Sequence, residues 1–199
     1  MKTNCELLLI RHGETVDNVR NIMQGQTHGE LNERGVEQAH IVAERLAGER
    51  IDAVLASDLR RAVQTAEIIA APHGLTVVTT PLLRERDWGS FTGRFIPELR
   101  GEAWPDDIET EQALLMRARS FLEYVTATFP GKRVVAVGHG ITNKAIMAVC
   151  AKCPMRDVQR MMNAEVRRLS LSPKKLQGCG IPCQDSRSTN ASSQEPDQA

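Results

Sequence analysis

Apolar residues in the first 172 positions fall into two alternating kinds of segment, short unbroken runs and longer stretches with helical spacing. Short aliphatic runs are typical of buried strands, and apolar positions three and four apart predict amphipathic helices. We expect strands over residues 5–10, 53–56, 76–80, 133–137 and 164–171. We expect helices over residues 31–47, 57–71, 108–128 and 141–150, the first of them with Asn32 as its N-cap.

Strands that alternate with helices pair in parallel and carry helices on both faces of the sheet. The pattern therefore predicts an α/β fold, a three-layer αβα sandwich with a mostly parallel sheet, in one domain over residues 1–172. Residues 173–199 contain no aromatic residue and few aliphatic ones, and they are rich in Ser, Asn, Gln and Pro. Such a segment buries too little apolar surface to offset its ordering entropy, so we predict a disordered tail there.

The charge balance limits the classes of partner. The chain has 25 Lys plus Arg and 25 Asp plus Glu residues, a formal net charge of zero. Binding to nucleic acid or to an anionic membrane needs a surplus of positive charge, so we expect neither partner. Without an apolar run long enough for a membrane span or a signal peptide, the expected location is the cytoplasm. Five cysteines, an odd number, favour reduced thiols over a disulfide framework.

Two histidines stand in matching contexts. His12 and His139 each directly follow a predicted strand, and each precedes a glycine, Gly13 and Gly140. The carboxyl ends of parallel strands are where open α/β sheets bind ligands, and glycine leaves room for one. A single histidine in such a place is most often a hydrogen-bonded residue at a strand end. Two of them favour a shared ligand site.

The neighbouring charges point to an anion as this ligand. Imidazole is a common metal ligand, but Arg11 and Arg60 lie at the same predicted sheet edge, and fixed cations repel a metal ion. Arg61 is interpreted as a solvated helix residue. Guanidinium groups match phosphate oxygens in pairs, so the combination favours a phosphate, with a neutral imidazole as nucleophile. Glu85 and Asp87 both remain candidates for the acid that protonates the leaving oxygen.

Five segments in order resemble the histidine phosphatase superfamily, and more narrowly its phosphoglycerate mutase-like branch. They are LLLIRHGETVDN at 7–18, QGQ at 24–26, SDLRRAVQTAEII at 57–69, LLRERDWG at 82–89 and VVAVGHG at 134–140. The resemblance spans residues 5–171. It departs from common family patterns at residues 29–33 and at Asn143 and Lys144, which affects the choice of substrate rather than the chemistry.

The resemblance implies a role for each site residue. His12 is then the phosphohistidine nucleophile and Glu85, rather than Asp87, the proton donor. Three residues then hold the phosphoryl oxygens: Arg11, Arg60 and His139. The residues expected to line the substrate pocket are Gly13, Thr15, Asn18, Gln24, Gly25 and Gly140. The partner implied is a small phosphorylated metabolite, with no cofactor and no metal.

Three alternatives to a phosphatase have distinct signatures. A phosphoglycerate mutase shields its phosphohistidine from water with a longer insertion between the glutamate and the second histidine. Here that segment is short, with a modest loop over residues 93–107, which favours water as the acceptor. A non-catalytic phospholigand-binding scaffold has no need of Glu85. A zinc site would use the thiolates of Cys150, Cys153, Cys179 and Cys183.

Overall fold

One five-stranded sheet forms the centre of the protein. The computed structural model describes residues 4–172. The strands lie in the order β3 (Val77–Thr79), β2 (Ala53–Ala56), β4 (Arg133–Gly138), β1 (Cys5–Arg11) and β5 (Val166–Leu171). The first four are parallel to their neighbours, and only β5 runs antiparallel, against β1. The mostly parallel sheet is confirmed, and the strand order, which periodicity does not encode, puts β1 directly beside β4.

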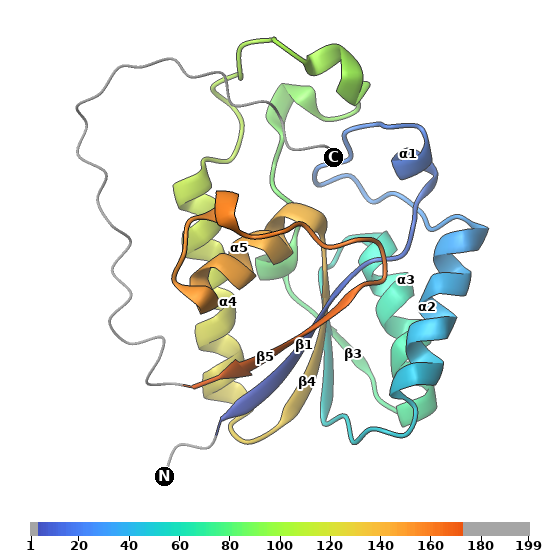
Figure 1. Ribbon diagram of the computed structural model, residues 1–199. Helices are drawn as coiled ribbons and strands as arrows, with labels where there is room; N and C mark the ends of the chain where they lie inside the picture. Colours follow the sequence, from blue (N-terminus) through green and yellow to red (C-terminus); the bar gives the residue numbers. More distant parts are fainter. Residues whose placement is uncertain (1–3, 173–199) are drawn as a thin grey trace.

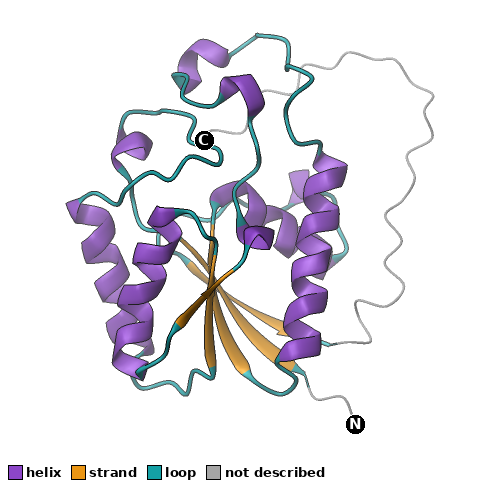
Figure 2. Ribbon diagram, turned by 180° about the vertical axis from the view of Figure 1, so that it is seen from behind, coloured by secondary structure: helices purple, strands orange, loops and turns teal. Residues whose placement is uncertain are grey.

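Helices cover both faces of the sheet, as predicted (Figure 1 and Figure 2). Helices α2 (Glu33–Leu46) and α3 (Arg60–Ala70) pack on one face, and α4 (Glu111–Thr128) and α5 (Gly140–Ala151) on the other. Successive side chains of β1 alternate between these layers, because strand residues point to opposite faces. Leu8 and Ile10 join the cluster under α2 and α3, whereas Leu7 and Leu9 join the cluster under α4 and α5.

Helices α2 and α4 begin where a side chain caps the first turn. Asn32 Oδ1 accepts a hydrogen bond of 2.7 Å from Gly35 N, so α2 begins at residue 33, and the predicted N-cap is confirmed. Thr110 Oγ1 accepts from Ala113 N at 3.1 Å, which starts α4 three residues after the predicted boundary at 108. Apolar spacing does not mark such boundaries, because it records only which face is buried.

Two long loops meet above the carboxyl ends of the parallel strands. Residues 12–32, which include the short helix α1 (Val16–Val19), follow β1. Residues 89–108, here called the covering loop, carry the turns η3 (Gly89–Phe91) and η4 (Ile96–Leu99). Backbone hydrogen bonds join the two loops, among them Met23 N to Arg94 O (2.9 Å) and Ile96 N to Asn21 O (2.8 Å). Both loops lie above the sheet in Figure 1.

Two further expectations concern the predicted tail and the possibility of a membrane-spanning helix. The predicted tail, residues 173–199, lies outside the described residues. Within residues 4–172, none of the helices combines the length and the apolar character needed to cross a membrane.

Candidate active site

The adjacency of β1 and β4 brings the two histidines into contact. Arg11 pairs with Gly138 in the strand register, and His12 N donates to Gly138 O at 3.1 Å. The residue that follows each strand is a histidine, His12 or His139, and the centroids of the two imidazole rings lie 5.1 Å apart. The matching sequence contexts thus correspond to one place in the fold.

His12 carries a defined tautomer. Its Nδ1 lies 2.7 Å from Gly13 O, and because a carbonyl only accepts, Nδ1 carries the proton and Nε2 the lone pair. The ring is buried, and burial lowers its pKa well below the usual 6.5, with the nearby charges of Arg61 and Arg11 acting in the same direction. The imidazole is therefore neutral at neutral pH, with a lone pair available.

His139 lies next to His12 and is fully buried. Burial is the main cause that lowers its pKa well below 6.5, followed by the charge of Arg61. Neither of its ring nitrogens hydrogen-bonds to a residue within the described part of the chain. His139 is also the N-cap residue of α5, with an extended backbone and no side-chain cap bond. Its ring is thus left with both nitrogens for another partner.

Two buried guanidinium groups flank His12. Arg11 Nη1 donates to Met161 O at 2.8 Å, and Arg61 Nη2 donates to Gly25 O at 2.8 Å. Burial lowers the pKa of each arginine to about 10, so both stay protonated at neutral pH. Neutral carbonyl groups hold both side chains in place, which orients the guanidinium groups without cancelling their charge. The surroundings of His12 are therefore strongly cationic.

The structure corrects the choice between Arg60 and Arg61. Arg60 has a side chain that is 59% exposed and forms an ion pair of 3.1 Å with Glu30. Arg61 is 1% exposed and lies on the buried stripe of α3 with Thr65 and Ile69. The sequence-based stripe was built from apolar residues alone and therefore skipped an arginine. The spacing 61, 65, 69 is the helical signal that would have found it.

The side chains around His12 enclose a pocket. Its lining residues are Arg11, His12, Asn18, Ile22, Met23, Gln24, Gly25, Arg61, Glu85, Trp88, Ile96, Ile141 and Arg160. Of the pocket residues predicted from sequence, Asn18, Gln24 and Gly25 are therefore present. Ile96 of the covering loop also lines the pocket, so this loop overlies part of it.

The other predicted site residues at this sheet edge, Gly13, Thr15, His139 and Gly140, are not among the residues that line the pocket. Thr15 is fully buried, and its Oγ1 accepts from Gln24 Nε2 at 2.8 Å, so it positions a lining residue. Gly13 allows α2 to approach, because a Cβ atom there would lie 2.3 Å from Gly35 O. A Cβ atom at Gly140 would lie 2.6 Å from Arg160 Nε. The two glycines thus make room for protein groups.

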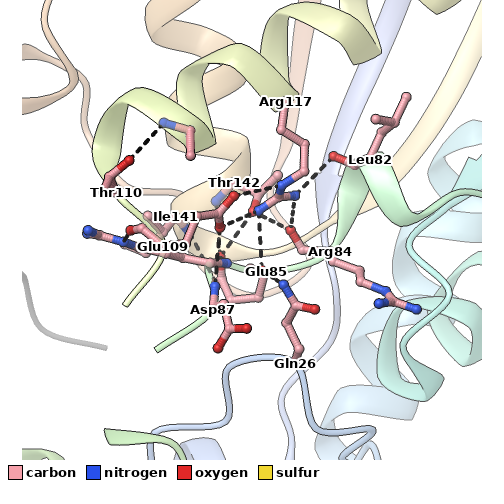
Figure 3. A network of polar contacts seen from close by, with 12 residues as sticks. Gln26, Leu82, Arg84, Glu85, Asp87, Glu109, Thr110, Arg117, Ile141 and Thr142 are labelled. Carbon is pink, nitrogen blue, oxygen red and sulfur yellow. Dashed lines mark hydrogen bonds and ion pairs between the residues drawn. The ribbon is translucent and has the colours of Figure 1, made fainter. Parts of the chain in front are cut away.

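Glu85 lies at the N-terminus of α5, beside Ile141 and Thr142 (Figure 3), and it is one of the residues that line the pocket. Its Oε2 accepts from Ile141 N at 3.2 Å, and its Oε1 accepts from Thr142 N at 3.1 Å. Asp87 is not among the lining residues, and its Oδ1 accepts from Gly89 N instead. The structure therefore places one of the two candidate acids in the pocket, beside His12 and the arginines.

A second set of contacts fixes the backbone of the Glu85 loop. Arg117 of α4 donates to the carbonyl oxygens of Arg84 (2.6 Å) and Glu85 (3.4 Å) and forms an ion pair of 2.7 Å with Glu109. Gln26 Nε2 also donates to Glu85 O, at 3.2 Å. As Figure 3 shows, these groups converge on the segment that carries the carboxylate. The position of Glu85 thus depends on α4 and on the loop after β1.

Besides Arg61, sequence reasoning missed six lining residues: Ile22, Met23, Trp88, Ile96, Ile141 and Arg160. Trp88 stands in a recognised segment but received no role; it packs against Trp104 with ring centroids 5.8 Å apart, and Arg86 lies 4.9 Å from each indole. Arg160 lies between α5 and β5, where no motif marks it. Only the packing of that connection against α5 reveals it.

The described residues also bear on the zinc alternative. Within residues 4–172, no group of three or more His, Cys, Asp or Glu side chains is arranged to hold a metal ion. Cys150 and Cys153 are reduced and half-buried at the end of α5. Cys179 and Cys183 lie outside the described residues.

Comparisons with known proteins agree with this geometry. Residues 7–178 match the model of the histidine phosphatase superfamily, branch 1. "Probable phosphoglycerate mutase GpmB" of Yersinia pestis is 33% identical over 181 residues, which cover 84% of this chain and 83% of that protein. The solved structure of mycobacterial glucosyl-3-phosphoglycerate phosphatase with VO3 has a TM-score of 0.76 at 30% identity, covering 82% of this chain and 91% of that one. Bacillus stearothermophilus YhfR has a TM-score of 0.77 at 27% identity, covering 82% and 90%.

Proposed function

The chain belongs to the histidine phosphatase superfamily, and on this premise we propose that it hydrolyses a small phosphomonoester through a phosphohistidine at His12. The observation that carries the proposal is the neutral His12 ring, with its Nε2 lone pair, in a pocket that also contains two buried arginines and one carboxyl group. A cationic pocket attracts a phosphate dianion, and a neutral imidazole beside it is a suitable nucleophile.

In the first step, His12 Nε2 attacks phosphorus, and a P–N bond forms while the P–O bond to the leaving alcohol breaks. In this proposal the charge on the equatorial oxygens is met by Arg11 and Arg61, which line the pocket, and by one ring N–H of His139, whose ring centroid lies 5.1 Å from that of His12. Glu85, in its protonated form, gives its proton to the leaving oxygen. The alcohol then departs neutral, which matters most when it is a poor leaving group.

In the second step, water releases the phosphate. Glu85, now ionised, accepts a proton from a water molecule whose oxygen attacks phosphorus, and the P–N bond breaks. His12 returns to its neutral form, with Nδ1 still donating to Gly13 O. Two easier transfers thus replace one slow hydrolysis.

A phosphoglycerate mutase is the second candidate, since one relative carries that name at 33% identity. A mutase retains its phosphohistidine until a second substrate oxygen accepts the group. We favour water as the acceptor because the segment between Glu85 and His139 is short, with the covering loop as its one long connection beside α4 and β4. The solved relative at 30% identity is named a phosphatase.

Phosphate release from p-nitrophenyl phosphate and from a panel of phosphorylated metabolites tests the proposal. We expect steady release by the wild type and none above background by His12→Ala. Full activity of the alanine variant would refute the role of His12. Interconversion of 2- and 3-phosphoglycerate without phosphate release would favour the mutase. Binding of orthophosphate without any turnover would favour the scaffold.

A further inference from the structure

Arg160 is a pocket residue for which the mechanism above has no task. It precedes Met161, a fully buried residue whose carbonyl oxygen accepts from Arg11 Nη1 at 2.8 Å. The sulfur of Met161 accepts from Asn143 Nδ2 at 3.6 Å, which ties this connection to α5. The backbone that carries Arg160 is thus anchored to the same arginine that flanks the nucleophile.

The guanidinium of Arg160 lies across the first residue of α5. A Cβ atom at Gly140 would lie 2.6 Å from Nε and 2.8 Å from Nη2 of Arg160, closer than side chains approach one another. Gly140 has ordinary helical geometry, so conformational freedom does not explain the glycine. Because Gly140 has no side chain, the guanidinium of Arg160 has room to lie beside it and line the pocket.

The charge in the pocket supports an anion as the partner of Arg160. The lining holds three guanidinium groups, and its one carboxyl group, that of Glu85, is protonated in the first step, so the pocket carries an excess of positive charge that suits a phosphomonoester dianion. The charge of Arg160 also lowers the pKa of Arg11 and of His12, which places it close to both.

We propose that Arg160 is a third arginine that binds the phosphoryl group, and that Gly140 provides the space in which its guanidinium lies. The proposal rests on the function proposed above and adds a substrate-binding residue and a positioning residue to it. Arg160 then contacts a phosphoryl oxygen from the side of α5, while Gly140 acts only through Arg160.

Binding of orthophosphate tests the assignment without requiring turnover. Trp88 lines the pocket, and the chain has only two tryptophans, which contact each other, so indole fluorescence reports on occupancy. We expect Arg160→Gln to raise the Kd for orthophosphate about 10- to 100-fold, the range for a lost charged hydrogen bond, and Arg160→Lys to recover part of it. The control is Arg156→Gln, whose side chain is 83% exposed and which should leave the Kd unchanged.

A double-mutant cycle separates the two residues. Gly140→Ala should weaken orthophosphate binding in the wild-type background and have no further effect in the Arg160→Gln background. Circular dichroism of each variant checks that the fold is retained. A Kd within twofold of wild type for Arg160→Gln, or an equal effect of Gly140→Ala in both backgrounds, would overturn the assignment.

The outcomes also separate this proposal from the proposed function. If the wild type hydrolyses phosphomonoesters and Arg160→Gln still binds orthophosphate normally, only the role of Arg160 is wrong. If orthophosphate binds with the expected dependence on Arg160 but no phosphomonoester is hydrolysed, only the catalytic proposal is wrong. A wild type that neither binds orthophosphate nor hydrolyses a phosphomonoester overturns both proposals.

Discussion

At the scale of single residues, the site depends on which nitrogen of His12 carries its proton. The bond from Nδ1 to Gly13 O leaves Nε2 with its lone pair, and burial keeps the ring neutral. Both conditions follow from the position of the ring at the end of β1. The same residue type at an exposed position would be partly protonated near neutral pH and a poorer nucleophile.

The adjacent residues Arg61 and Arg60 provide a test variant and its matched control. We expect Arg61→Gln to lower kcat/KM about 10²- to 10³-fold, because one preorganised donor to the phosphoryl oxygens is lost. Arg60→Gln should stay within twofold of wild type, since that side chain is exposed and pairs with Glu30. Steady-state kinetics with p-nitrophenyl phosphate decides the matter. The reverse order of effects would restore the assignment made from sequence.

The carboxyl group of Glu85 should contribute more to the rate of hydrolysis when the leaving group is poorer. We expect Glu85→Gln to slow hydrolysis of alkyl phosphates about 10²- to 10⁴-fold, and hydrolysis of p-nitrophenyl phosphate much less, because nitrophenolate departs without a proton. Turnover numbers for both substrates measure this difference. Equal slowing of the two substrates would assign Glu85 to binding instead of proton transfer.

The arginine pair also shows what sequence reasoning resolves at the residue scale. The resemblance implied Arg60, and Arg61 was interpreted as a solvated residue, whereas the structure places Arg61 in the pocket lining. Arg61 is buried because three backbone carbonyls, those of Gly25, Thr27 and His28, accept from its guanidinium. These acceptors come from a loop some 35 positions earlier in the chain, and no local pattern contains that information.

At the scale of elements, the site forms where the carboxyl ends of β1 and β4 lie next to the N-terminus of α5. The two histidines directly follow β1 and β4, and the first turn of α5 donates to the Glu85 carboxylate. Spacing of apolar residues predicted all of these elements, since each buries one face. It could not predict that β1 and β4 are neighbours, because strand order depends on contacts between segments more than 100 residues apart.

Helix α4 contributes to the site through Arg117, which donates to the backbone carbonyls of Arg84 and Glu85 and so positions the Glu85 loop. We expect Arg117→Gln to lower kcat for alkyl phosphates roughly tenfold with little change in KM, since the carboxyl group moves while the arginines stay. Arg119→Gln, on the same helix with an exposed partner in Glu123, is the control. A change confined to KM would show that Arg117 acts on binding instead.

At the scale of the whole molecule, the two buried histidines couple folding to pH. Burial lowers the pKa of His12 and of His139 in the folded state below the ordinary 6.5. Below pH 6.5 the unfolded chain therefore binds protons that the folded protein does not. The free energy of unfolding must then fall as the pH decreases, and it is fully retained above pH 7.

Urea unfolding at pH 7.5, 6.5 and 5.5 measures this dependence. We expect the unfolding free energy to drop by up to about 1.4 kcal/mol per pH unit for each histidine below pH 6.5. The carboxyl groups with lowered pKa, such as Asp58 beside Arg84, lose their contribution only at pH values below their unfolded range, near 4. His139→Gln should reduce the slope between pH 6.5 and 5.5. Equal stability of the wild type at these two values would contradict the buried neutral rings.

The central claim is that His12 carries the phosphoryl group during turnover. Its most direct test is to mix the enzyme with a phosphomonoester, quench in alkali within milliseconds, and locate the modified residue by mass spectrometry. We predict a phosphate on His12 that survives alkali and is lost in acid, and none in His12→Ala. Phosphate on another residue, or turnover by the alanine variant, would contradict the account.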